Sequence, residues 1–279
     1  MKTVLKLNAK TGLLIMLMIL SLTGCKKDNN NGDVSVKVTD DPFPVSFVTE
    51  ANVEIAKIEL KNENGEYVTV LESSASTNMV NYTNGATAEI AVTAIPEGKY
   101  SEAKLTMGTA SIYLSDSRYF NDTASANQSV TVKVSPELEV QSGQSQEILL
   151  DLDLSDSFEL GGMFGGWFTS VAQITGITSF HPDFRAVSLS KTGSIEGHVT
   201  DSQNNAMAYC VVQVAYDYSG DGSPDTVSTI ADAHGNYKII GLPTATYEIT
   251  VKADNHAEVH QQNVQVSISN TTHANITVN

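Results

Sequence analysis

The stretch Asp232-Ala-His-Gly-Asn-Tyr-Lys-Ile-Ile-Gly-Leu-Pro243 decides the fold of the last third of this 279-residue chain. Gly235 supplies a tight turn, and Tyr237 and Ile239 after it point to one face of a strand. Gly241 and Pro243 break that strand before the next one returns, because proline lacks the backbone N–H that a sheet ladder needs. Apolar and polar residues alternate again in the next run, Tyr247-Glu-Ile-Thr-Val-Lys-Ala253. The pattern predicts consecutive β-strands.

Together with Gly193-Ser-Ile-Glu-Gly-His-Val-Thr-Asp201, these runs resemble a carboxypeptidase regulatory-like domain over residues 193–279. The resemblance implies a seven-stranded, transthyretin-like β-sandwich. Thr246 departs from the family, which usually has glycine before the tyrosine at this point. We therefore expect another backbone geometry at that turn.

Period-two alternation also dominates the chain before residue 192, and turn residues such as Asn64-Gly65 and Asn84-Gly85 separate the runs. A slip near Ala56-Lys57 predicts a β-bulge. Many short strands with regular turns predict an all-β domain, either a sandwich or a barrel. Helix is expected, if anywhere, only near residues 167–174. The alternating runs are 34–38, 53–60, 67–71, 88–92, 129–134 and 150–154.

Residues 33–189 resemble a second family, the domain of unknown function 4382. Its landmarks here are Val38-Thr-Asp-Asp-Pro42, Ile95-Pro-Glu-Gly-Lys-Tyr100 and Leu149-Leu-Asp-Leu-Asp-Leu154, with Phe184-Arg-Ala-Val187 as the closing strand. The family occurs in bacterial lipoproteins, often upstream of a regulatory-like domain. The resemblance implies a β-rich fold and no known activity.

The N-terminus carries Lys2, Lys6 and Lys10, then a mainly apolar run from Leu13 to Leu22, then Thr-Gly-Cys25. Ten residues span about 15 Å as a helix, half of a hydrocarbon core, so the run suits a signal peptide and not a membrane span. The pattern resembles a bacterial lipoprotein signal with its lipobox. That resemblance implies removal of residues 1–24, a diacylglycerol thioether on Cys25 and a flexible tether over residues 25–32.

The resemblance also implies a place in the cell envelope. Lys26 follows the cysteine, whereas inner-membrane retention in some lipoproteins uses Asp there, so we expect an outer-membrane lipoprotein, either periplasmic or exposed at the surface. Removal of residues 1–24 takes away three lysines and no acid, which changes the net charge from −16 to −19. A chain this acidic repels phosphates, so nucleic acid is not expected as a partner, and the membrane contact is left to the lipid.

Only two cysteines occur, Cys25 and Cys210. If the first carries lipid, no intrachain disulfide can form. Cys210 lies in a strand-like run, and we expect a buried, inert thiol there.

The best candidate for a cofactor site is Asp217-Tyr-Ser-Gly-Asp-Gly-Ser-Pro-Asp225, which resembles the calcium loops of dockerin and thrombospondin type. Its oxygen ligands would be Asp217, Ser219, Asp221 and Asp225, and Gly222 would permit the sharp turn. Ser219 is a poorer ligand than a carboxylate, and position 12 is Ser228 instead of a bidentate Glu. The other interpretation is a polar connection between two strands. No other cofactor is expected.

His256-Ala-Glu-Val-His260 lacks the spacing of a helical zinc peptidase motif. In a strand, His256, Glu258 and His260 would share one face, which we interpret as a solvated face more readily than as a metal site.

The run from Phe158 to Phe168 holds the only tryptophan and two glycine pairs. Phe164, Trp167 and Phe168 are expected to plug the sandwich, the alternative being a mobile loop that stacks on a sugar or contacts a partner.

No nucleophile elbow, phosphate-binding loop or Cys–His pair is present in the sequence. We therefore expect a non-catalytic, lipid-anchored envelope protein that binds or scaffolds a glycan or a protein. The alternative is an envelope hydrolase with an acidic site in residues 33–189. An exposed aromatic platform would favour binding, and a cleft with two converging buried carboxylates would favour catalysis.

Overall fold

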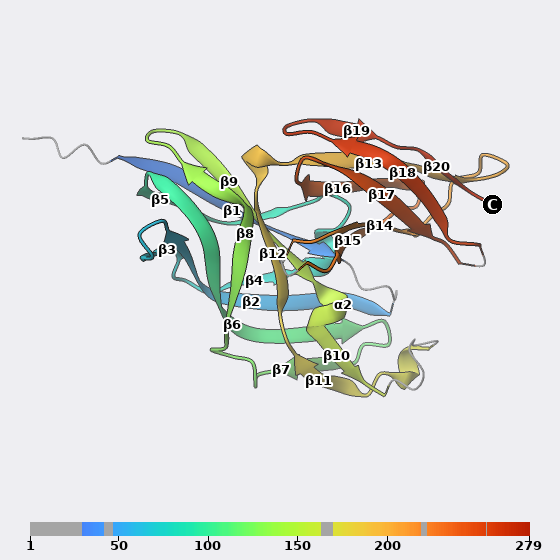
Figure 1. Ribbon diagram of the computed structural model, residues 1–279. Coiled ribbons are helices and arrows are strands. Elements are labelled where there is room, and N and C mark those ends of the chain that lie inside the picture. The colour runs from blue at the N-terminus through green and yellow to red at the C-terminus, as the bar shows by residue number, and fades with distance from the viewer. Residues whose placement is uncertain (1–29, 42–46, 163–169, 219–221, 255) are drawn as a thin grey trace, which may run out of the picture.

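The computed structural model describes residues 30–41, 47–162, 170–218, 222–254 and 256–279 (Figure 1). The fold is all-β, as the sequence predicts: a large sheet at the N-terminal end is followed by a sandwich of smaller sheets. Several residues singled out by the sequence lie outside the described residues, namely Cys25, Ser219, Asp221, Phe164, Trp167 and Phe168.

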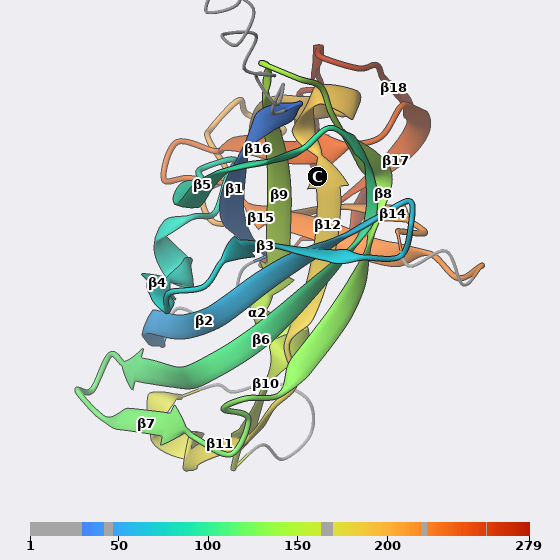
Figure 2. The same ribbon diagram turned by 90° about the vertical axis from the view of Figure 1, so that its left-hand side faces the viewer.

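A ten-stranded sheet makes up the N-terminal domain. Along it the strand order is β3-β2-β6-β8-β12-β9-β1-β5, with β4 paired to β2 and β7 paired to β6. The two end strands, β3 and β5, come into contact, so the sheet curls into a near-barrel (Figure 2). The strands are β1 (Asn31–Asp41), β2 (Val48–Asn62), β3 (Tyr67–Leu71), β4 (Ala75–Asn78), β5 (Ala88–Pro96), β6 (Gly98–Leu114), β7 (Tyr119–Asp122), β8 (Ser129–Val140), β9 (Ser145–Asp153) and β12 (Asp183–Ser188).

Short elements connect these strands. A separate antiparallel pair, β10 (Phe158–Gly161) and β11 (Gly176–Phe180), follows the single-turn helix α2 (Leu154–Ser157). The 3-10 turns are η1 (Met79–Asn81), η2 (Val171–Gln173) and η3 (Leu189–Lys191). The turn η2 falls within the stretch where the sequence allows helix. The helix α2 is not predicted by the sequence, and it forms because the Asp153 side chain caps it by accepting a bond from the backbone N of Asp156.

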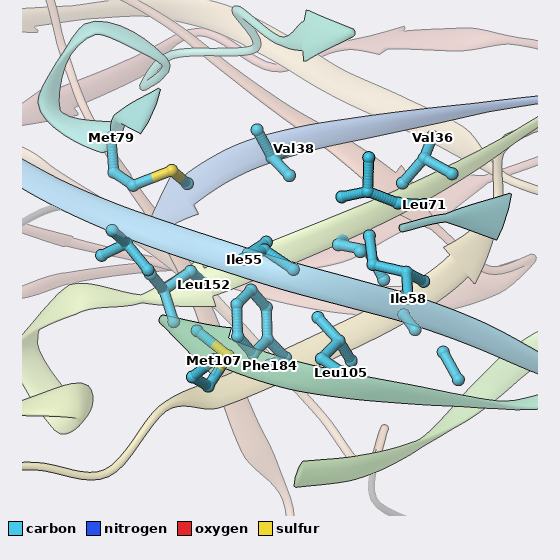
Figure 3. Close-up of a cluster of buried hydrophobic side chains, with 14 of the residues drawn as sticks. Val36, Val38, Ile55, Ile58, Leu71, Met79, Leu105, Met107, Leu152 and Phe184 are labelled. Carbon is cyan, nitrogen blue, oxygen red and sulfur yellow. The ribbon is translucent and has the colours of Figure 1, made fainter. Parts of the chain in front are cut away.

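The core of the near-barrel follows the alternation of the sequence. In β1, Val34, Val36 and Val38 are buried, and Figure 3 shows Val36 and Val38 directed into the same cluster as Phe184 of β12. Ile55 and Ile58 of β2 are both buried although they are three positions apart, which would place them on opposite faces of a regular strand. The register of β2 shifts between Ile55 and Lys57, which confirms the predicted bulge and turns both side chains inward.

The C-terminal domain is a sandwich of two sheets, ordered β16-β13-β19 and β15-β14-β17-β18. The short strands β19 and β20 pair in parallel with successive parts of β13, so they occupy one strand position. The sandwich therefore has seven strand positions, as predicted. Its strands are β13 (Gly193–Asp201), β14 (Val211–Tyr216), β15 (Asp225–Ile230), β16 (Asn236–Leu242), β17 (Ala245–Lys252), β18 (Val259–Val266), β19 (Thr271–His273) and β20 (Ile276–Val278).

Residues 232–243 form the turn and strand that their sequence predicts. Gly235 has φ +79° in the turn before β16, and Tyr237 and Ile239 are both buried between the sheets. Thr246 lies in β17 opposite Gln265 and takes no part in the turn. The Tyr247 hydroxyl donates to the carbonyl of Pro243 at 2.8 Å, so a side chain holds the turn where the family uses glycine.

Candidate functional site

An acidic cluster lies on the outer face of the large sheet, where β1, β9 and β12 run side by side. The register places Asp41 opposite Asp153, and Asp153 opposite Asp183. Two residues away in β9, and so on the same face, Asp151 is opposite Arg185. We call this set the acidic junction; its members are Asp41, Asp151, Asp153, Asp183 and Arg185.

The C-terminal sandwich covers the acidic junction. The Arg185 Nη2 donates to Asp151 Oδ2 at 2.5 Å, and Nη1 donates to the carbonyl of Gly241 at 2.6 Å. Asp41 accepts a bond from the backbone N of Ser228 at 2.7 Å and a second from its hydroxyl. The Arg185–Asp151 pair lies within the near-barrel, whereas the bonds to Gly241 of β16 and Ser228 of β15 join the near-barrel to the sandwich, so the junction connects the two domains.

Gly241 permits the close approach at this contact. Its φ is +70°, and an added Cβ would lie 3.0 Å from Leu149 Cδ2 and 3.0 Å from Val187 Cγ2. A larger residue would strain the backbone and press on both side chains. The glycine that ends a strand in the sequence therefore also serves as a contact point between domains.

The Asn84-Gly85 turn is a second link between the domains. Asn84 N donates to Thr229 Oγ1 at 3.0 Å, Asn84 Nδ2 donates to the Asn236 carbonyl at 3.2 Å, and Lys238 N donates to Asn84 Oδ1 at 2.5 Å. Both turn residues have positive φ, +55° and +77°. The sequence identifies the pair as a strand separator, and only the structure shows that it docks on the sandwich.

Burial changes the acidity of the junction. It raises the pKa of Asp153 to about 6, although bonds from Asp156 N and Ser155 Oγ act in the opposite direction. Burial also raises the pKa of Asp41 well above its usual range, followed in effect by the charges of Asp153 and Asp151. Protons are therefore held in this region at pH values where an exposed carboxyl would have released them.

Asp40 is buried on the other face of β1. Alternation places it beside Leu152, on the side of the core, and its side chain is 4% exposed. Neither carboxyl oxygen has a hydrogen-bond partner among the described residues. Burial, and then the charge of Asp151, raise the pKa of Asp40 well above its usual range.

The acidic junction has no room for a substrate. The two cavities between the domains at this point measure about 10 Å³ each, one lined by Asp41, Asp183 and Tyr218 and the other by Asp40 and Asn84. A volume of roughly 10–15 Å³ holds one water molecule. The carboxylates come together as an acidic site would require, but the sandwich closes over them.

A larger hollow, about 650 Å³, lies beside the junction. It runs along the first half of β8 and reaches the start of β12, and Tyr218 of the C-terminal domain forms part of its rim. We call it the β8 groove; its lining residues are Ser101, Glu102, Val130, Thr131, Val132, Lys133, Asp183, Phe184 and Tyr218.

The predicted calcium loop is only partly within the described residues. Asp217 Oδ2 accepts a bond from Gly222 N at 3.0 Å, and Asp225 Oδ2 accepts one from Tyr218 N at 3.0 Å. Ser228, which lies in β15, donates to Asp41 of β1 and is not directed to the loop. In the described parts of the chain, no group of three or more His, Cys, Asp or Glu side chains is arranged to hold a metal. Calcium binding stays a prediction.

The structure contradicts the expectation for the His256–His260 run and confirms the one for Cys210. Of His256, Glu258 and His260, only His260 lies in β18. Its Nδ1 is 2.8 Å from Glu248 Oε1, and its Nε2 is 3.3 Å from Glu258 Oε1. The shared strand face that the sequence suggests is therefore not formed. Cys210 is 2% exposed and burial raises its pKa, which confirms the buried thiol.

Phe158, at the start of the aromatic run, is buried against Phe180 with ring centroids 4.6 Å apart. Both rings belong to the core of the near-barrel, so the contact packs the β10–β11 pair against that core. Among the described residues, no helix is long and apolar enough to cross a membrane.

Comparison with known families defines the class of protein: two β-domains of known family in series. The model of the domain of unknown function DUF4382 matches residues 31–167, and that of the carboxypeptidase regulatory-like domain matches residues 194–279. The chain therefore carries a DUF4382 domain followed by a carboxypeptidase regulatory-like domain, in the predicted order. Strand β12 lies beyond the first match although it is central in the sheet.

Solved structures resemble the chain only distantly. They include 3-chlorocatechol 1,2-dioxygenase from Rhodococcus opacus 1CP, with 11% identity, 32% of this chain and 60% of that chain covered, and a TM-score of 0.25. The Bacillus anthracis TIE protein is 12% identical, with 98% of this chain and 45% of that chain covered and a TM-score of 0.26. The Bacillus cereus major pilin subunit BcpA is 13% identical, with 89% of this chain and 70% of that chain covered and a TM-score of 0.23. The chain thus spans less than two thirds of the first two, and scores this low support no functional inference. No curated protein matches the chain.

Proposed function

We propose that this protein is a non-catalytic, lipid-anchored component of the cell envelope that binds or scaffolds a protein partner at the outer-membrane surface. The lipobox-like Leu22-Thr-Gly-Cys25 supports the anchor, with the thioether on Cys25. The C-terminal domain belongs to a regulatory-like family and not to a catalytic one.

The observation that carries this proposal is the closure of the acidic junction. A hydrolase with a site in residues 33–189 would use the converging carboxylates of that region, and those are Asp41, Asp151, Asp153 and Asp183. Cavities of about 10 Å³ admit no substrate there. Since Arg185 and Ser228 bond across the domains, the cluster serves cohesion, and the open surface is left for binding.

A protein partner is favoured over a glycan. Among the described residues, the exposed ring pair Tyr113 and Tyr119 has centroids 4.7 Å apart but an interplanar angle of 43°, so it presents no flat platform for a sugar ring. The β8 groove, at about 650 Å³, is of the size that proteins use to bind ligands.

Two measurements test the proposal. Labelling with an acyl probe is expected for the wild type and lost in Cys25→Ala, and equal labelling of both would contradict the anchor. The full chain is also applied to peptide and glycan arrays and to a panel of envelope polymers. Binding without turnover supports the proposal, whereas hydrolysis that Asp153→Asn abolishes would establish the enzyme instead.

A further inference from the structure

Three turns surround the start of β1 at one end of the near-barrel. Glu97, in the turn between β5 and β6, donates its backbone N–H to the Asn30 carbonyl at 2.7 Å. Gly143, in the turn between β8 and β9, donates in the same way to the Asn31 carbonyl at 2.8 Å. The turn between β2 and β3 lies at the same end, because Asn62 pairs with β6 close to its start. We call this surface the β1 end; its members are residues 30–31, 62–66, 96–98 and 141–144.

The chain between the predicted lipid and the β1 end is short. Cys25 would hold the acyl chains at the bilayer surface, and five steps of the chain, from residue 25 to residue 30, separate it from Asn30. An extended chain covers at most about 3.6 Å for each step, so Asn30 lies no farther than about 18 Å from the lipidated cysteine. This limit follows from chain length alone and holds for any conformation of these residues.

The sandwich extends away from the β1 end. It begins near that end, because Lys191 Nζ, just before β13, lies 3.3 Å from Glu139 Oε2, two residues before the turn at 141–144. Strand β13 then continues for nine residues, which is about 26 Å from its first residue to its last. Val278 pairs with Asp201, so the C-terminus lies at the far end of β13. Figure 1 shows the start of β1 and the C-terminus at opposite ends of the molecule.

Charge does not attract the molecule to a bilayer. Glu63, Glu66 and Glu97 of the β1 end take part in no ion pair of the described residues, whereas the three lysines next to this end are each paired with a glutamate. The rest of the chain is also acidic. Anionic head groups repel such a surface, so the sandwich is not expected to lie down on the bilayer. The three lysines are Lys61, Lys99 and Lys191.

We propose that the β1 end faces the bilayer surface, with Asn30 within about 18 Å of the lipidated Cys25, and that the sandwich projects away from the bilayer. This inference rests on the lipid anchor proposed above, and it names the surface that the protein turns to the phospholipid head groups. The turn after β13 and the C-terminus, at the other end of the molecule, are then accessible to a partner that approaches from the side away from the bilayer.

Energy transfer from labelled cysteines to head-group acceptors tests this orientation. The lipidated full chain is reconstituted in vesicles of phosphatidylethanolamine and phosphatidylglycerol that carry an acceptor dye on their head groups. The thioether occupies Cys25 and Cys210 is buried, so an introduced cysteine is the reactive thiol. Three exposed positions carry the label, one variant at a time. Ser142→Cys reports on the β1 end, Ser202→Cys on the far turn of the sandwich and Ser115→Cys on the far end of the near-barrel.

We expect at least about twofold more energy transfer from Ser142→Cys than from Ser202→Cys, because β13 alone adds about 26 Å to the distance of the second label. A flexible Gly-Ser spacer of about ten residues, with an r.m.s. length of roughly 17 Å, should reduce this advantage when it is inserted before Asn30. The same spacer after Asn279 is the matched control and should change nothing. Added salt should not lower the transfer, because charge does not hold the protein there. Thermal melts that match wild type establish that each variant is folded.

The outcomes separate the orientation from the anchor. Equal transfer from the three labels would mean that the molecule lies along the bilayer, and the highest transfer from Ser202→Cys would mean that it is reversed. Either result overturns the orientation and leaves the anchor in place. Flotation with the vesicles tests the anchor itself, since the wild type should float and Cys25→Ser should not. If both proteins float, or neither does, the lipid anchor fails and the orientation fails with it.

Discussion

Asp153→Asn tests the reasoning about the acidic junction most directly. The carboxyl group has its pKa raised by burial from an ordinary 3.8 to about 6. At about 1.36 kcal/mol for each pKa unit, that difference corresponds to at most about 3 kcal/mol. Since the folded pKa is raised, the folded state holds the proton more tightly, so stability falls as pH rises from about 3.8 to about 6.

Asparagine removes this titration and keeps the local structure. Asp153 caps α2 by accepting bonds from Asp156 N at 2.9 Å and Ser155 Oγ at 2.7 Å, and an asparagine side-chain oxygen can accept both. We therefore expect Asp153→Asn to be more stable than wild type at pH 7.5 by up to about 3 kcal/mol, and the difference to disappear below about pH 4.

Urea unfolding at a series of pH values from 3.5 to 8 measures the free energy of unfolding of both proteins. Asp232→Asn is a control of opposite sign, because hydrogen bonds from Asn236 lower the pKa of that exposed carboxyl. The ionised Asp232 carboxylate of the wild type should therefore stabilise the fold near neutral pH, and this contribution should be lost in acid. A stability difference between wild type and Asp153→Asn that does not change with pH would refute the argument.

Three further predictions concern the two domains. Arg185→Ala leaves Asp151 buried without its partner, so we expect a loss of about 3–5 kcal/mol in urea unfolding, much more than for Lys99→Ala at an exposed, solvent-screened ion pair. Residues 193–279 pair only among themselves within the described sheets, so this fragment should unfold cooperatively alone, and a disordered NMR spectrum would contradict that boundary. Millimolar Ca²⁺ should raise the melting temperature of the full chain, and Asp221→Ala should remove that rise. At a free Ca²⁺ concentration 100 times the dissociation constant, the free energy of unfolding should increase by about 2.7 kcal/mol. Calorimetry that detects no heat of binding would identify the loop as an ordinary acidic turn.

Local patterns in the sequence account for much of the fold. The alternation of Val34, Val36 and Val38, the slip after Ile55 and the turn at Gly235 all appear in the structure where they are predicted. Each depends on the geometry of a strand or turn over a few residues, so the sequence carries the information directly. The order of the two families was likewise readable from short motifs.

The candidate sites were much less predictable. Leu150-Asp-Leu-Asp-Leu154 alternates, which predicts a strand with one apolar and one acidic face, and on the acidic face Asp151 is 7% exposed and paired with Arg185. The alternation states which face is polar and not what covers it. The β8 groove carries no sequence motif, because residues from β6, β8, β12 and the C-terminal domain line it together.

By itself, then, the sequence determined the all-β class, the seven-position sandwich, the buried Cys210 and the order of the domains, because each follows from contacts between near neighbours or from a family motif. Only the tertiary structure decided that the acidic face of β9 is covered, that Asn84-Gly85 docks on the sandwich and that residues of β6, β8 and β12 line one groove with Tyr218. These features depend on residues far apart in the chain, such as Asn84 with Lys238 and Asp41 with Ser228. Their pairing is set by how two folded domains fit together, which no local periodicity encodes.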